Sequence, residues 1–119
     1  MADTTTTLSE LKELLQAFVR ERDWEQYHSP KNLSMNISIE AAELMEKFLW
    51  VTTQESHEEV AKNRVEIEQE FADVFVGLLK FANVCEIDIS RAVRNKVELD
   101  AKKYPVEKAK GRREKYNRL

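Results

Sequence analysis

The chain has 119 residues, a net charge of −3, two glycines, two prolines and a single cysteine. This length suits one domain with a modest core, and few turn formers with 34% charged residues favour long helices. The sequence lacks an apolar run of membrane-spanning length, its polar start does not resemble a secretory signal, and its lone cysteine cannot form an internal disulfide, so we expect a reducing, cytoplasmic setting.

Two helices are expected in the first half of the chain. Thr7 and Glu10 have the spacing of a capping box, and apolar residues then recur at helical intervals over residues 8–22. The period breaks over 23–30, where a proline ends a predicted loop. A second apolar stripe predicts a helix over about 32–51.

Two further helices are expected in the second half. Residues 52–57 form a polar connection, and Ser56 repeats the capping-box spacing before a third helix that runs to about Cys85. The second half of that helix, residues 71–84, is apolar almost all round and should be its most buried part. Asp88 caps a fourth helix that spans about Ser90 to Lys103.

Four helices with short links predict an all-α fold, a four-helix antiparallel bundle. We expect a single domain over residues 1–119, with a flexible N-terminus over 1–7 and a basic tail over 106–119. The tail has a net charge of +4, which leaves −7 for the rest of the chain. Such a tail can attract phosphate or nucleic acid, although a solvated end or a contact with an acidic partner subunit is the simpler interpretation.

Two carboxylate pairs carry the candidate chemistry. Glu40 and Glu43 share a face of the second helix, and Glu70 and Asp73 share a face of the third, because residues three apart on a helix are neighbours. In antiparallel helices the two pairs can meet. Four facing carboxylates repel one another unless a hard cation such as Mg²⁺ or Mn²⁺ lies between them.

The spacing alone is a weak signal, because 17 glutamates produce such pairs by chance on solvated faces. The context is stronger, since Asp73 stands in the most apolar part of the chain and its charge needs compensation there. Glu66 and Glu68 lie in a more polar stretch and are better read as surface residues. Glu46 is a further candidate, with a surface role more typical of its position.

Residues 39–50, followed by Glu70 and Asp73, resemble the ExxE…ExxD signature of the MazG-like nucleoside triphosphate pyrophosphohydrolases. The resemblance covers about residues 8–116. Three more segments are similar to the dCTP pyrophosphatase branch of that family: 21–28, 30–33 and 96–105.

The resemblance implies a MazG-like fold completed by oligomerisation, as a dimer or tetramer, in which helices of two subunits build each site. It implies hydrolysis of a nucleoside triphosphate, dCTP, dATP or a modified dNTP, to monophosphate and pyrophosphate, which would clear unwanted nucleotides from the pool. The catalytic metal ligands would be Glu40, Glu43, Glu70 and Asp73, holding Mg²⁺ with Mn²⁺ as a possible substitute. Neither a membrane nor a nucleic acid is the expected partner.

The resemblance also implies substrate-binding positions. Trp24 and Trp50 match aromatic positions that can stack on a base, and Lys96 matches a phosphate-binding lysine. Without the resemblance, both tryptophans would be interpreted as core or interface residues, and Lys96 as a surface residue. The full set of candidates is Trp24, His28, Asn32, Trp50, Gly77, Lys96, Asp100, Lys103 and Tyr104.

Three positions depart from the dCTP branch. Leu15 replaces a His, Gly77 replaces a Tyr and Asp100 replaces an Asn. A glycine inside a helix suggests that space is needed there, and a wider pocket would admit a purine. Asp100 lacks the hydrogen-bond donor that an Asn side chain would offer at this position. A preference for cytosine is therefore in doubt.

Two other functions compete with this hypothesis. A di-iron bundle needs two Glu-x-x-His motifs on helices, and the one such spacing, Glu25 to His28, lies in a predicted loop. The alternative that stays open is a non-enzymatic helical oligomeric interaction module with a basic nucleic-acid-binding tail.

Overall fold

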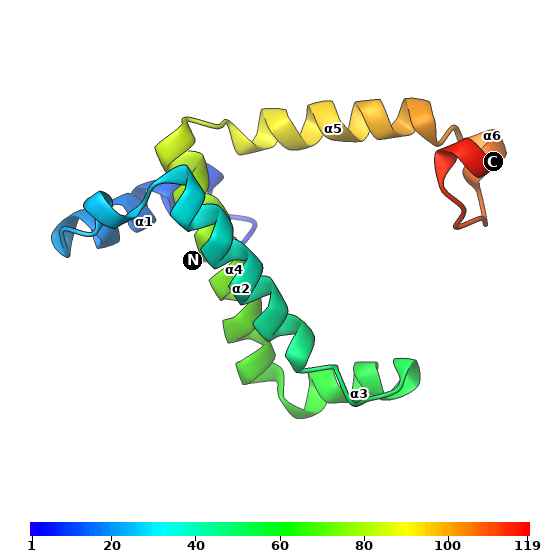
Figure 1. The fold of residues 1–119 in the computed structure, drawn as a ribbon, viewed down its shortest axis with the longest axis horizontal. Coiled ribbons are helices and arrows are strands. Elements are labelled where there is room, and N and C mark those ends of the chain that lie inside the picture. Colours follow the sequence, from blue (N-terminus) through cyan, green and yellow to red (C-terminus); the bar gives the residue numbers. More distant parts are fainter. The chain divides into compact units, whose positions relative to one another are not determined.

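The computed structural model describes all residues 1–119 and is built from helices without a strand, which confirms the all-α prediction (Figure 1). None of the helices combines the length and the apolar character needed to cross a membrane. The α-helices are α1 (Leu8–Glu21), α2 (Pro30–Glu46), α3 (Thr53–Lys62), α4 (Arg64–Cys85), α5 (Ile89–Lys103) and α6 (Val106–Ala109). Two 3₁₀ turns are η1 (Glu25–Tyr27) and η2 (Tyr116–Arg118).

The chain forms two compact units, Met1–Ile87 and Asp88–Leu119. The first unit contains α1 to α4 and carries 8 basic and 17 acidic residues. The second contains α5, α6 and η2 and carries 11 basic and 5 acidic residues. The positive charge expected for the tail therefore extends through α5, and the two units have opposite net charges.

The central feature of the first unit is the antiparallel pair of α2 and α4, which run side by side in opposite directions (Figure 1). Lys47 at the end of α2 forms an ion pair with Glu66 near the start of α4, at 3.4 Å. Near the middle of α2, Ile37 lies against Gly77 of α4. These two contacts fix the antiparallel register.

Helix α1 packs on α4 and is tied to its C-terminal end. The Lys12 ammonium donates to the carbonyl of Ile87, and the Asn83 amide donates to the carbonyl of Lys12 at 3.0 Å. A cation is favourable there because the last carbonyls of a helix carry partial negative charge. The buried apolar side chains of the core are Val19, Leu33, Leu79 and Ala82.

Several local predictions are confirmed. The Thr7 side chain accepts from the Glu10 amide at 3.1 Å, and Asp88 accepts from the Arg91 amide at 2.9 Å, so both act as N-caps. Helix α1 ends one residue before the predicted boundary and α5 starts one residue earlier. Such differences are within the fraying of helix ends.

The second helix differs from its prediction at both ends. It begins at Pro30, because Ser29 is the N-cap and a proline fits the first helical turn without losing a hydrogen bond. It ends at Glu46 and not at Val51, since residues 47–50 form turns that bond to carbonyls three residues back. The apolar stripe continues past the point where the helix stops.

The predicted third helix is two helices, and Ser56 does not cap it. Thr52 is the N-cap of α3, with its hydroxyl accepting from the Glu55 amide and donating to the Glu55 carboxylate. Asn63 leaves the helical region at φ −121° and ψ 40°, and its side chain bonds to Glu59. Asn has a low helix propensity, and the chain breaks at this residue into α3 and α4.

The prediction that residues 71–84 are deeply buried is confirmed only in part. Gly77, Leu79 and Ala82 are buried, but Phe71 remains 62% exposed. The partner helices of the first unit cover only part of the apolar circumference of α4. Within one chain the structure contains the antiparallel α2–α4 pair, and a four-helix bundle completed by a second subunit stays a prediction.

Candidate active site

The antiparallel register brings the two carboxylate pairs together. Counting from the Lys47–Glu66 and Ile37–Gly77 contacts, Glu40 of α2 falls opposite Asp73 of α4, and Glu43 falls opposite Glu70. One ligand atom from each of these four residues lies within 4.8 Å of the others. The structure thus assembles the set expected from the sequence, which we call the carboxylate cluster.

The carboxylate cluster contains uncompensated negative charge. One oxygen of Glu40 and one of Glu70 are buried without a hydrogen-bond partner. Burial of the Glu40 carboxyl raises its pKa, and a hydrogen bond with Glu43 and the negative charges of Glu43, Asp73 and Glu70 raise the pKa further. Buried polar oxygens are rarely left without partners in folded proteins, so the cluster suits a bound cation.

The donor set fits Mg²⁺ or Mn²⁺. It offers carboxylate oxygens only, which hard cations prefer, and contains neither His nor Cys. Nearby acids have other roles: Glu66 pairs with Lys47, and Glu68 pairs with Arg64 at 3.2 Å on the surface. Glu46 lies outside the cluster.

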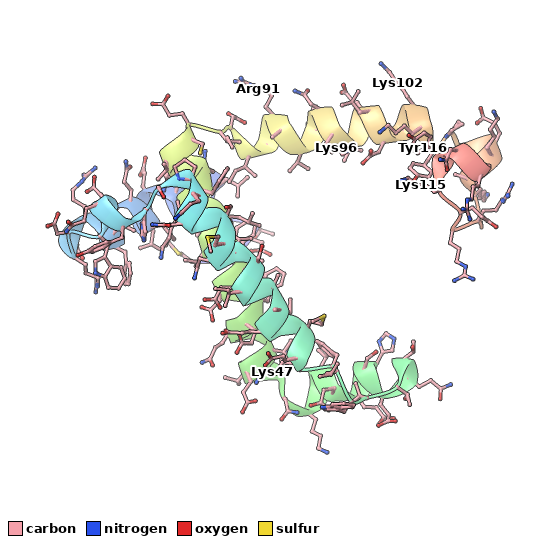
Figure 2. The ribbon with its side chains drawn as sticks, viewed as in Figure 1. Lys47, Arg91, Lys96, Lys102, Lys115 and Tyr116 are labelled. Atoms are coloured by element: carbon pink, nitrogen blue, oxygen red, sulfur yellow. The ribbon has the colours of Figure 1, made fainter.

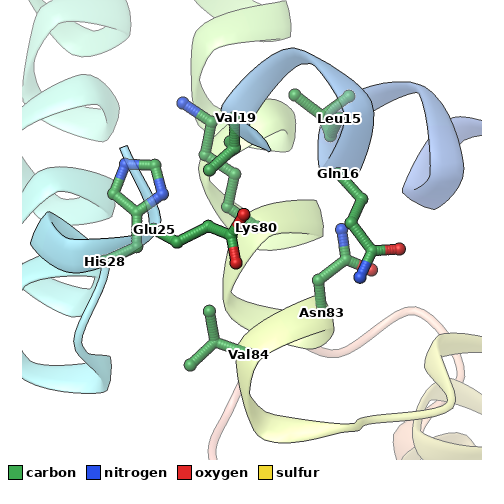
Figure 3. A pocket seen from close by; sticks show the side chains of 8 residues that line it. All are labelled: Leu15, Gln16, Val19, Glu25, His28, Lys80, Asn83 and Val84. Carbon is green, nitrogen blue, oxygen red and sulfur yellow. The ribbon is translucent and has the colours of Figure 1, made fainter. Parts of the chain in front are cut away.

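A cavity of about 290 Å³ lies between α1, η1 and α4 (Figure 3). The side chains that line it are Leu15, Gln16, Val19, Glu25, His28, Lys80, Asn83 and Val84. Partial burial lowers the pKa of His28, and the positive charge of Lys80 lowers it further, so the imidazole is neutral at physiological pH. The cavity therefore combines apolar walls with several hydrogen-bonding groups.

The sequence-predicted substrate residues of the first unit occupy different surroundings. His28 lines the cavity. Trp24 packs edge-on against Phe18, with ring centroids 5.7 Å apart. Asn32 donates to the carbonyl of Tyr27 at 3.0 Å, and this bond ties the first turn of α2 to η1. Trp50, in the turn after α2, is 90% exposed and does not line this cavity.

Gly77 does not open a wider pocket, contrary to the interpretation drawn from the sequence. It is buried, and a Cβ at this position would meet Cγ1 of Ile37 at 2.9 Å. The space beside the glycine is filled by α2, so the residue permits close helix packing. Gly77 therefore gives no support for a pocket that admits a purine base.

The remaining predicted residues lie in the second unit. The Lys96 ammonium bonds the Asp100 carboxylate at 2.8 Å on the exposed surface of α5, and this bond and the negative charge raise the pKa of Lys96. Lys103 lies over the Tyr116 ring at 5.1 Å, and Tyr104 packs edge-on against the same ring. Figure 2 shows Lys96 on α5 and Tyr116 near the C-terminus.

Comparison with known proteins identifies the family. Residues 35–119 match the MazG-like family model. The chain belongs to the MazG-like family. Curated relatives of this MazG-like chain include dCTP pyrophosphatase 1 from Rattus norvegicus, 36% identical over 115 residues, and the human protein, 34% identical. Each alignment spans 95% of this chain and 68% of the relative.

A solved structure shows the same fold. The crystal structure of a pyrophosphatase from Archaeoglobus fulgidus matches this MazG-like chain with a TM-score of 0.81 and 40% identity. The match covers 88% of the MazG-like chain and 98% of the archaeal chain. The helical arrangement is therefore that of a known pyrophosphatase.

Sequence reasoning missed most of the cavity in this MazG-like chain. Gln16, Glu25, Lys80 and Asn83 line it but were not among the predicted site residues. One signal was present: after Asp73, Lys80 and Asn83 are the only hydrogen-bonding side chains in the apolar stretch 71–84. Polar residues in such a stretch need a local partner or a solvent-filled space.

Proposed function

We propose that this enzyme, a nucleoside triphosphate pyrophosphatase, converts a deoxynucleoside triphosphate to the monophosphate and pyrophosphate with Mg²⁺ held by the carboxylate cluster. The carboxylate cluster carries the proposal, because a bound cation would compensate four neighbouring carboxylates of which two have a buried oxygen without a hydrogen-bond partner. Removal of unwanted or excess nucleotides is the role that we assign to the reaction. Mn²⁺ would serve as a substitute metal.

The proposed reaction is attack of water on the α-phosphorus, with pyrophosphate as the leaving group. When bound, Mg²⁺ would supply charge neutralisation for the triphosphate and a site for the attacking water. Glu40 and Glu43 from α2, with Glu70 and Asp73 from α4, would hold it. One of these carboxylates would accept the proton that the water loses, and the antiparallel pair of helices keeps all of them in place.

The cavity is the proposed site of the nucleoside. Lys80 follows Asp73 by seven residues on α4, which is about 10.5 Å along the helix axis. A nucleoside attached to phosphates at the carboxylate cluster spans a comparable length. The volume of about 290 Å³ is near the lower limit for small-molecule sites, roughly 300 Å³. The candidate substrates are dCTP, which the names of the mammalian relatives suggest, dATP and modified dNTPs.

The second unit is proposed to supply positive charge to the triphosphate in an oligomer. Its 11 basic residues oppose 5 acidic ones, and Lys96 and Lys103 are the candidate phosphate ligands. Val93 and Val97 of α5 are 57% and 60% exposed, which leaves an apolar stripe free to pack against another subunit. A dimer or tetramer would cover it and add a second pair of helices around each site. In such an oligomer, Trp50 would contact the nucleotide bound to the partner subunit.

The test is incubation with a panel of dNTPs and NTPs in the presence of Mg²⁺, with the products resolved by chromatography. We expect a monophosphate and pyrophosphate in equal amounts from at least one deoxynucleotide, and loss of both on chelation with EDTA. Release of a single phosphate, or no turnover of any nucleotide, would refute the proposal. Light scattering of the same sample determines whether the protein is a dimer or a tetramer.

The basic second unit also keeps a second function open, a non-enzymatic interaction module that binds nucleic acid. Two variants separate the functions. If removal of residues 106–119 abolishes RNA or DNA binding and Glu40→Gln has no effect on any activity, the interaction module is supported. If Glu40→Gln abolishes nucleotide hydrolysis, the enzyme is supported.

A further inference from the structure

Gly77 lies where α2 and α4 approach each other closely. A Cβ on this residue would stand 2.9 Å from Cγ1 of Ile37 and 3.8 Å from Oδ1 of Asn36. Carbon atoms in ordinary contact are about 3.5–4.0 Å apart. Any side chain at position 77 would therefore overlap Ile37.

Ile37 cannot easily move out of the way. It is β-branched, and such side chains have one strongly preferred χ1 rotamer in a helix because of the preceding turn. The Cγ1 atom is fixed by χ1, so its position follows the backbone of α2 directly. The overlap would be relieved by moving α2 and α4 apart.

This contact is one helical turn from the carboxylate cluster on both helices. Gly77 follows Asp73 by four residues, and Ile37 precedes Glu40 by three. One turn of helix is about 5.4 Å, so a wedge at residue 77 would separate the helices beside the carboxylates that they carry. The ligand atoms, now within 4.8 Å of one another, would spread.

We propose that Gly77, because it faces the β-branched Ile37, is a positioning residue that sets the separation of α2 and α4 so that the carboxylate cluster selects Mg²⁺ over larger cations. The Tyr that the dCTP branch carries at position 77 would then require a residue that is not β-branched at position 37. The proposal rests on the proposed function, since it requires that the cluster bind a metal. Mg²⁺ demands near-octahedral geometry at about 2.0–2.1 Å, whereas Ca²⁺ accepts about 2.3–2.6 Å and irregular geometry. A widened cluster therefore loses more affinity for Mg²⁺ than for Ca²⁺.

The experiment uses the full chain and measures metal affinity without substrate. Dissociation constants of Mg²⁺ and Ca²⁺ are obtained by competition with Mn²⁺, followed by electron paramagnetic resonance. For Gly77→Ala we expect the Mg²⁺ constant to rise about tenfold, as for other residues that orient metal ligands. The Ca²⁺ constant should change less than about threefold. Alanine favours a helix more than glycine does, so a general loss of helix is not the expected cause.

Two backgrounds at position 37 provide the control. Ile37→Ala removes both γ carbons, and Gly77→Ala should then leave Mg²⁺ affinity within about twofold of the Ile37→Ala parent. Ile37→Val keeps both γ carbons, so Gly77→Ala in this background should retain the full loss. The pair also keeps the test informative if Gly77→Ala alone folds poorly, because the alanine background removes the overlap.

Three results would overturn the proposal. Unchanged Mg²⁺ affinity and selectivity in Gly77→Ala would show that the helix separation does not matter. Equal losses in the Ile37→Ala and Ile37→Val backgrounds would show that the contact with Ile37 is not the cause. Absence of metal binding by the unaltered chain would overturn the proposed function together with this inference, whereas the first two results leave that function intact.

Discussion

Replacing Glu40 with glutamine tests the interpretation of the carboxylate cluster most directly. The change keeps the size of the side chain and removes one of four negative charges whose ligand atoms lie within 4.8 Å of one another. At 4.8 Å, two unit charges repel by about 1 kcal/mol at the dielectric constant of water and about 3.5 kcal/mol at the value typical near a protein surface. Asp73 is exposed, so the lower figure is the safer estimate.

We expect opposite effects in the absence and presence of metal. Without metal, Glu40→Gln should raise the free energy of unfolding by at least about 1 kcal/mol, a rise in the melting midpoint of roughly 3–5 °C for a chain of this size. With Mg²⁺ at a hundred times its dissociation constant, the unaltered chain should gain about 2.7 kcal/mol. The variant should lose most of that gain, because it lacks a ligand oxygen with full charge.

The assay is thermal unfolding with EDTA and with increasing Mg²⁺, followed by circular dichroism. Glu46→Gln is the matched control, since Glu46 lies on the same helix but outside the cluster. It removes the same charge and should change stability by less than about 0.5 kcal/mol in either condition. If Glu40→Gln lowers the metal-free midpoint and keeps the full gain from Mg²⁺, the reasoning is wrong.

Three further predictions concern the ends of helices and the second unit. Thr52→Ala should destabilise the protein by about 1 kcal/mol in urea unfolding while Ser56→Ala has little effect, because the structure assigns the cap of α3 to the threonine; the reverse order would contradict that assignment. Lys12→Met should lower the free energy of unfolding by about 1–2 kcal/mol in the same assay, through loss of the charged hydrogen bond that ties α1 to the end of α4. Asp100→Asn should free Lys96 to bind phosphate. Because exposed ion pairs contribute little, KM for the triphosphate should fall by at most about twofold with kcat unchanged. A higher KM would argue against a phosphate-binding role for Lys96.

The sequence by itself determined the features that depend on neighbouring residues. The helical character of the chain, the caps at Thr7 and Asp88 and the pairing of Glu40 with Glu43 on one face all follow from spacings of three or four residues. Such spacings fix which groups are adjacent on a helix whatever the rest of the fold does. The family resemblance also lay in the order of these local motifs along the chain.

Only the tertiary structure decided the features that join distant residues. The register of α2 against α4 brings the two carboxylate pairs within 4.8 Å, and it places Ile37 where a side chain on Gly77 would overlap it. From the sequence this glycine resembled an open pocket position, because its spacing does not reveal which helix covers it. The cavity beside Lys80 was missed for the same reason. Packing between helices depends on which faces meet, and the local pattern of one helix does not contain that information.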